Sequence, residues 1–241
     1  MELQNKILYF IHIPKTSGSS LESKQIIKLG HNFNVPNIYR IPCDKGGHNN
    51  YKIDRWGLYN YPNPNNIKIT IIRNPFDMLC SYYFHGEPLK PDNVYCHSGW
   101  ASVNYTHQFK SFKEFIISYC DPNFEWHIPA FKNFLYSQLF DINHNCVADI
   151  IIKYEYIDEA KDILNTQLKH KIQKNVKLNI SKYKTKNYKD YYDKEMIELV
   201  NKKCERELNI FNYDFNGSTK KDPLILNCNI KYNVYEDIII N

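Results

Sequence analysis

A lysine and a run of small hydroxyl residues follow the first apolar segment of the chain. Residues 6–13 (KILYFIHI) are predicted to form a buried strand, and the segment 19–29 is predicted to be a helix that ends at Gly30. A loop between a strand and a helix directs backbone N–H groups and the positive end of the helix dipole at a bound anion. The loop is therefore predicted to be an anion site made by Lys15, Thr16, Ser17, Gly18, Ser19 and Ser20.

The lysine of this loop precedes its glycine, which distinguishes the loop from a Walker A motif. A Walker A loop has a glycine, four further residues and then a Gly-Lys-Ser/Thr unit, and this sequence lacks that unit. The order disfavours hydrolysis of a magnesium nucleotide. Lys15 would instead supply positive charge where a bridging oxygen gains charge during group transfer. The alternative is a serine-rich turn with an exposed lysine.

A second candidate anchor follows the next apolar segment. Residues 67–72 (IKITII) are predicted to form another buried strand, and Arg73 stands directly after it. The segment 75–84 is predicted to be a helix with Asn74 as its N-cap and Pro75 at its first position. Arg73 is therefore expected at the carboxyl end of a strand, the edge at which open parallel sheets bind ligands.

Arg73 and Ser81 are together suited to holding a phosphate. A guanidinium group makes forked contacts with phosphate oxygens. A serine about two helical turns further along the chain can face the same anion. The alternative is that Arg73 pairs with Asp77 and that Ser81 is a hydroxyl of the core.

Taken together, these segments resemble the sulfotransferases that use 3′-phosphoadenosine 5′-phosphosulfate (PAPS), especially the carbohydrate branch of that family. FIHIPKTSGSSLE is similar to the family's loop for the 5′-phosphosulfate, and TIIRNPFDMLCSYYF is similar to its motif for the 3′-phosphate. A third similar segment, 179–215, leads from an N-x-S and tyrosine-rich stretch into a last helix that ends in F-x-Y-x-F. The resemblance spans residues 6–215, with 216–241 as a tail.

The resemblance implies one domain over residues 1–241, with a three-layer, P-loop-like α/β fold in which helices flank a mainly parallel central sheet. It implies transfer of a sulfuryl group from PAPS to a hydroxyl, expected to be that of a carbohydrate, without a metal ion. Residues 15–20 would hold the 5′-phosphosulfate, and Arg73 and Ser81 the 3′-phosphate. Ser181 and Lys182 are candidates for closing over the nucleotide. The family commonly has glycine or alanine where Ser17 stands, a small departure that should not block binding.

The acceptor hydroxyl must lose its proton as it attacks, and His or Glu usually serves as the base. His48 is the first candidate, because two glycines directly precede it in the long loop 31–66 and the carbohydrate branch often has a histidine at about this place. His31 is the second, although about 11 helical residues, roughly 16 Å, separate it from the anion loop. The remaining candidates are His85, His97, His107 and Glu87. His12 is expected to be a packed core histidine.

The other predicted elements complete an alternating pattern. Helices are predicted at 111–120, 123–140, 157–168 and 189–208, and strands at 147–153, within 31–66 and within 222–241. Strands that alternate with helices predict an α/β fold whose sheet is mainly parallel.

Composition limits the function classes. The chain has 241 residues and a net charge of +5, which suits an anionic ligand but falls short of a protein that coats nucleic acid. Its seven cysteines show no metal-ligand spacing and are expected to be free thiols in a reducing compartment. Neither a signal peptide nor a membrane span is evident, so an intracellular, cytoplasmic location is expected. The oligomeric state stays open.

Two other functions compete with sulfuryl transfer. One is a P-loop kinase-like enzyme. The missing Gly-Lys-Ser/Thr unit disfavours it, and so does the lack of an evident acidic pair for magnesium after a strand. The other is a non-catalytic glycan-binding protein on a sulfotransferase fold, against which the presence of Lys15 and Arg73 argues.

Overall fold

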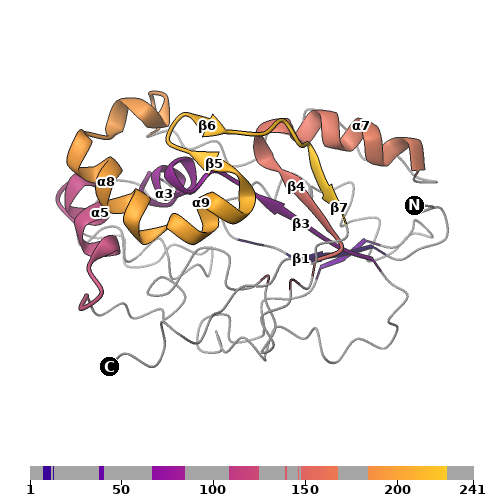
Figure 1. Cartoon of the computed structure of the whole chain (residues 1–241), viewed down its shortest axis with the longest axis horizontal. Helices are drawn as coiled ribbons and strands as arrows, with labels where there is room; N and C mark the ends of the chain where they lie inside the picture. The colour runs from indigo at the N-terminus through magenta and orange to yellow at the C-terminus, as the bar shows by residue number, and fades with distance from the viewer. Residues whose placement is uncertain are drawn as a thin grey trace, which may run out of the picture. The chain divides into compact units, whose positions relative to one another are not determined.

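Figure 1 draws the computed structural model of the whole chain. Its contacts divide the chain into two units. The first comprises Met1–Arg73, Tyr136–Asn179 and Lys221–Asn241, and the second comprises Asn74–Leu135 and Ile180–Lys220. The structure describes residues 8–11, 13, 38–40, 67–84, 109–124, 139, 146, 148–167 and 184–226. The helix predicted at 19–29 and most of that predicted at 123–140 lie outside these ranges. One domain over 1–241 stays a prediction, because division by contacts does not show how many parts fold independently.

In the described part of the first unit, five strands form one sheet in the order β2-β1-β3-β4-β7. Their bounds are β1 Leu8–Ile11, β2 Ile38–Arg40, β3 Ile67–Ile72, β4 Ile150–Lys153 and β7 Leu224–Leu226. Three pairs are parallel, and β7 runs antiparallel to β4 at the edge. The α/β class is confirmed in the form of helices and strands around a small mixed sheet. The predicted strands at 6–13, 67–72 and 147–153 and those within 31–66 and 222–241 are confirmed.

One face of this sheet is covered by α7 (Ile157–Gln167), the helix predicted at 157–168. Branched side chains on alternate positions of β3 and β4 pack against small and apolar residues of the helix, which suits isoleucine on a pleated surface. The cluster consists of Ile69, Ile71, Ile150, Ile152, Ala160 and Leu164, all buried. Tyr154 packs against it from η4 (Tyr154–Tyr156), the single turn between β4 and α7.

The opposite face of the sheet is buried as well. Successive residues of a strand point to opposite faces, so Thr70 and Ile72 of β3 share the second face with Ile151 and Lys153 of β4. All four side chains are fully buried. Burial on both faces is typical of parallel strands, and it explains why the sequence shows near-continuous apolar runs here.

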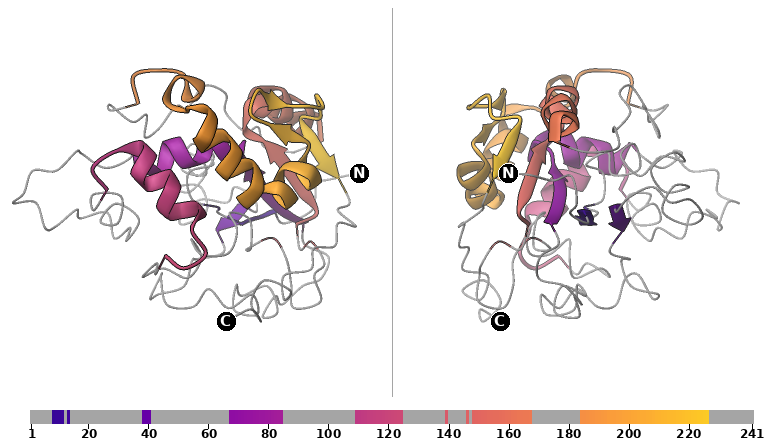
Figure 2. Two further views of the ribbon diagram at one scale, coloured as in Figure 1. Left: turned by 60° about the vertical axis from the view of Figure 1, so that its left-hand side comes forward. Right: turned by 90° about the vertical axis from the view of Figure 1, so that its right-hand side faces the viewer.

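The second unit is mainly helical in its described part. It contains α3 (Pro75–Tyr83), α5 (Phe112–Cys120), η5 (Tyr188–Tyr191), α8 (Lys194–Lys203), α9 (Glu205–Phe211) and a hairpin of β5 (Tyr213–Asp214) and β6 (Gly217–Ser218). Helices α5 and α8 lie side by side (Figures 1 and 2). Lys113 of α5 joins them through ion pairs with Asp193 at 2.9 Å and Glu195 at 2.5 Å.

Three of the four α-helices in this part begin with a side-chain cap, which satisfies a backbone N–H that has no partner within the helix. The caps are Asn74 on the N–H of Phe76 (3.0 Å), Ser111 on that of Glu114 (3.1 Å) and Asp193 on that of Met196 (2.9 Å). The predicted helix at 75–84, with its Asn74 cap and Pro75, and the predicted helix at 111–120 are confirmed.

The single helix predicted at 189–208 is wrong, because the chain leaves the helical conformation twice. Tyr192 and Asp193 are extended and separate η5 from α8, and Cys204 (φ −107°, ψ 18°) separates α8 from α9. The Tyr192 ring packs against Phe76, and its hydroxyl group donates to the Phe76 carbonyl at 2.8 Å. A contact over more than 100 residues of chain thus interrupts a segment whose apolar periodicity alone indicates one helix.

Aromatic rings fill the core of the second unit. The Phe76 ring lies edge-on to Tyr192 at 5.3 Å and to Phe215 at 5.1 Å, a favourable arrangement of ring quadrupoles.

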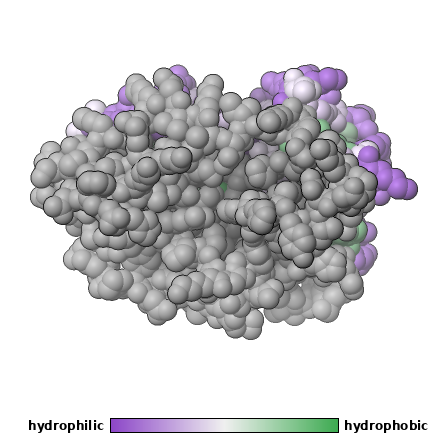
Figure 3. Space-filling model, turned by 180° about the vertical axis from the view of Figure 1, so that it is seen from behind, coloured by the Kyte–Doolittle hydropathy of each residue, from purple (hydrophilic) through white to green (hydrophobic). Residues whose placement is uncertain are grey.

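Over the described residues, the large hydrophobic side chains that stay exposed are Ile117 and Ile163. Described atoms that are visible from behind are mostly hydrophilic (Figure 3). Within the described ranges, no helix has the length and apolar character needed to cross a membrane.

Candidate anion site at the sheet edge and the polar network on helix α3

Arg73 lies at the carboxyl end of β3, where a tyrosine ring holds its guanidinium group. The side chain is 8% exposed, and its Cζ atom is 4.4 Å from the centroid of the Tyr154 ring. Tyr154 directly follows β4, the parallel neighbour of β3. Arg73 and Tyr154 meet because both strands end at the same edge of the sheet. Stacking uses the face of the guanidinium group, whereas a forked phosphate contact uses N–H groups at its edge. The arrangement is compatible with binding an oxyanion.

A buried lysine, Lys153, ends strand β4. Its backbone pairs in register with Ile72, and its side chain is fully buried on the sheet face opposite the α7 cluster. Lys153 was not among the site residues expected from the sequence. The signal was a lysine that ends an apolar run, in the same way that Arg73 follows the run of β3. The carboxyl ends of two adjacent parallel strands thus carry one buried basic residue each.

Strand β1 lies on the other side of β3 and runs parallel to it. The register joins Leu8 to Ile67 and Ile11 to Thr70. Since the strands are parallel, the chain leaves β1 toward the same sheet edge at which Arg73 stands. Ile13, the last described residue before the predicted anion loop, is fully buried. The sheet order therefore agrees with an anion loop and an arginine on adjacent strands.

Most of the predicted site residues lie outside the described ranges. These are Lys15, Thr16, Ser17, Gly18, Ser19, Ser20, His31, His48, Ser181 and Lys182, together with the alternative bases His85, Glu87, His97 and His107. Ser81 is described and is half-buried on α3. The roles of all these residues stay predictions.

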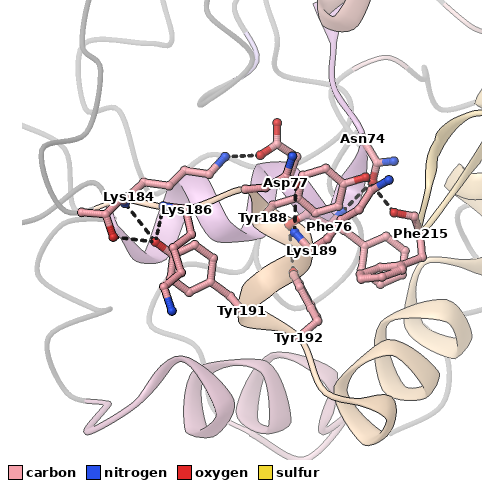
Figure 4. A network of polar contacts seen from close by, with 12 residues as sticks. Asn74, Phe76, Asp77, Lys184, Lys186, Tyr188, Lys189, Tyr191, Tyr192 and Phe215 are labelled. Atoms are coloured by element: carbon pink, nitrogen blue, oxygen red, sulfur yellow. Dashed lines mark hydrogen bonds and ion pairs between the residues drawn. The ribbon is translucent and has the colours of Figure 1, made fainter.

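In the second unit, a network of polar contacts surrounds the first turn of α3 (Figure 4). The Asn74 amide both caps the helix and donates to the Asp214 carbonyl at 2.7 Å. Asp77, in the same turn, forms an ion pair with Lys184, whose side chain is 19% exposed against 13% for Asp77. The alternative in which Arg73 pairs with Asp77 stays a prediction. Nothing in the sequence spacing links residues 77 and 184.

Tyrosine hydroxyl groups extend this network by binding backbone atoms. Tyr188 donates to the Phe215 carbonyl at 2.7 Å, and Tyr191 accepts from the N–H groups of Thr185 at 2.9 Å and Lys186 at 3.1 Å. Burial raises the pKa of Tyr192 well above its ordinary value. That hydroxyl group therefore stays protonated and keeps donating to the backbone at neutral pH.

Two of the described cysteines are held in the protonated thiol form by burial. Cys80, Cys120, Cys146 and Cys204 are free thiols. Burial raises the pKa of Cys120 to about 12 and that of Cys204 well above the ordinary thiol value. Both thiols therefore stay protonated at neutral pH, and the thiolate is the reactive form.

Comparison of the chain with protein-family models, with curated proteins and with solved structures finds no match.

Proposed function

We propose that this protein is a sulfotransferase that moves a sulfuryl group from PAPS to a hydroxyl group of a carbohydrate. The proposal includes a three-layer, P-loop-like fold in which the described sheet forms the central layer. The motif order supports it, since a strand, a Lys-Thr-Ser-Gly-Ser-Ser loop and a helix precede a strand, Arg73 and a second helix.

The observation that carries the proposal is the position of Arg73 in the sheet. The guanidinium group is buried at the carboxyl end of β3 and stacked on Tyr154. The neighbouring strand β1 runs parallel and leads into the predicted anion loop. Parallel α/β sheets bind nucleotides at this edge, and an arginine and a lysine loop on adjacent strands suit a donor with two separated anionic groups.

In the proposed reaction the acceptor oxygen attacks the sulfur of PAPS in line with the leaving phosphate. The bond between sulfur and the bridging oxygen breaks, so that the products are a sulfate ester and adenosine 3′,5′-bisphosphate. His48, or His31 in its place, takes the proton of the hydroxyl group. Lys15 and the N–H groups of its loop offset the charge on the bridging oxygen. Arg73 and Ser81 bind the 3′-phosphate.

The donor can be tested by thermal unfolding of the full chain. A ligand that binds the native state alone raises the melting temperature, so PAPS and adenosine 3′,5′-bisphosphate should raise it. ATP should do much less, because it lacks the 3′-phosphate. Equal stabilisation by ATP would overturn the donor assignment and favour the kinase-like alternative. Activity that EDTA abolishes and Mg²⁺ restores would argue in the same direction.

Turnover separates the enzyme from a glycan-binding protein on the same fold. The full chain is incubated with labelled PAPS and a panel of glycans, peptides and small alcohols. Transfer of label to a carbohydrate, lost in Lys15→Ala, is the expected result. Glycan binding that Lys15→Ala leaves unchanged, with no transfer to any acceptor, would replace the proposal with the binding function.

A further inference from the structure

Lys184 places a positive charge beside the first turn of α3. Its ammonium group pairs with the carboxylate of Asp77, and both side chains are largely buried. Figure 4 shows Lys184 extending alongside α3 to reach Asp77. A pair this far from solvent is poorly screened by salt, so its geometry is better defined than that of a surface pair.

The pair lies on the helix face that also carries Ser81. Asp77 and Ser81 are four residues apart in α3, and residues at this spacing are neighbours on a helix surface. Ser81 is half-buried and its hydroxyl group can donate a hydrogen bond to an oxyanion. One turn of helix therefore brings a hydroxyl donor and a fixed cation to the same face.

A second lysine shares the surroundings of Lys184. The Nζ atom of Lys184 is 6.0 Å from the centroid of the Tyr188 ring, and that of Lys189 is 5.9 Å from the same centroid. Both lysines therefore place positive charge around one ring, which favours an anionic ligand there.

We propose that Lys184 is an oxyanion-binding residue that Asp77 holds in place until the ligand arrives. The ligand group is a phosphate or sulfate ester, and Ser81 contributes a hydrogen bond from the same helix face. A doubly charged phosphate attracts an ammonium group more strongly than one carboxylate does. Lys184 can then move from Asp77 to the ligand by rotation within its flexible side chain.

This proposal rests on the proposed function only for the identity of the molecule that carries the phosphate or sulfate ester. The group is either the 3′-phosphate of the nucleotide or a charged group of an acidic carbohydrate acceptor. Two probes distinguish them: adenosine 3′,5′-bisphosphate and a sulfated oligosaccharide, each titrated into the full chain by calorimetry at one fixed salt concentration.

Two single substitutions should change affinity for the bound probe in opposite directions. Lys184→Met removes a charge-assisted contact and should weaken binding by about 10- to 100-fold. Asp77→Asn removes the carboxylate that competes with the ligand and should strengthen binding by about two- to fivefold. A purely structural ion pair would give a different result, because both substitutions would then weaken binding together.

The exposed pair of Lys194 and Glu198 on α8 provides a matched control. The Nζ atom of Lys194 is 3.9 Å from Oε1 of Glu198, and the two side chains are 92% and 67% exposed, respectively. Lys194→Met changes the net charge as Lys184→Met does, and Glu198→Gln changes it as Asp77→Asn does. The two control variants therefore report the general effect of net charge on anion binding. Affinities equal to those of the wild type are expected for both.

These titrations distinguish a failure of the Lys184 proposal from a failure of PAPS as the donor. If the wild type binds the sulfated oligosaccharide but not the bisphosphate, the proposed donor fails, and Lys184 is then tested on the oligosaccharide. The inference is overturned if Lys184→Met binds both probes as the wild type does, or if the wild type binds neither. Should Lys184→Met fail to fold because Asp77 is left buried without its partner, the double variant Asp77→Asn/Lys184→Met removes both charges and must bind the probe more weakly than Asp77→Asn does.

Discussion

Two cations of this protein are held in place by different means. In the first unit, Arg73 stacks its guanidinium group on the ring of Tyr154 at the end of a sheet. In the second unit, the ammonium group of Lys184 pairs with the carboxylate of Asp77 on helix α3. A ring orients a cation through contact with the ring face, whereas a carboxylate offsets the charge of the cation until something displaces it.

The backbone around each of the two cations is also held in place by a different kind of contact. Arg73 follows a strand fixed by backbone pairing with both neighbours and by an isoleucine core. The first turn of α3, in contrast, depends on side chains that bind backbone atoms, among them Asn74 and Tyr192. Removing Arg73 should therefore affect ligand binding, and removing Asn74 or Tyr192 should affect the stability of the second unit.

The largest effect is expected for Arg73→Ala. Loss of a forked, largely buried contact should weaken binding of adenosine 3′,5′-bisphosphate by about 2–4 kcal/mol, measured by calorimetry. Stacking of Arg73 on Tyr154 is lost from the free protein as well, so the free energy of unfolding of this variant is measured in urea titrations beside its affinity. Arg73→Lys keeps the charge without the fork and should also bind weakly. Normal binding by Arg73→Ala would remove the contrast between the two cations.

A smaller effect is expected for Asn74→Ala. The substitution removes the cap of α3 and the hydrogen bond to the Asp214 carbonyl, and should lower the free energy of unfolding by about 1–3 kcal/mol in urea titrations. Asn74→Ser is the matched variant, because serine retains a capping oxygen but cannot reach Asp214 in the same way. An intermediate stability is expected for it. Equal stability of both variants and the wild type would show that the network of Figure 4 does not hold α3.

The smallest effect at neutral pH is expected for Tyr192→Phe. The ring packing is retained and one hydrogen bond is lost, so the free energy of unfolding should fall by about 1 kcal/mol. Burial raises the pKa of Tyr192 above its ordinary value of 10.0. The folded protein therefore holds this proton more tightly than the unfolded chain does. The stabilisation is complete below pH 10 and is lost as the pH rises further, so wild type and variant should converge in alkaline urea titrations. A constant difference between them would contradict the assignment.

Local pattern determined much of the fold. Apolar runs located β1, β3 and β4, and the Asn-Pro pair after Arg73 located the start of α3 because its cap depends on adjacent residues. The same reasoning failed at 189–208, where Tyr192 packs on a helix more than 100 residues away. Lys153 was missed because a lysine after an apolar run is usually taken for a solvated strand end.

The sequence by itself determined which residues are suited to anion chemistry, since residue type and order express local geometry: a lysine loop after one strand and an arginine after the next. Only the tertiary structure decided which of the described residues meet. It set β1 beside β3, placed Tyr154 under Arg73, and brought Lys184 to Asp77. Such contacts join positions far apart in the chain, and they depend on how whole elements pack, which no spacing of residues along the sequence can express.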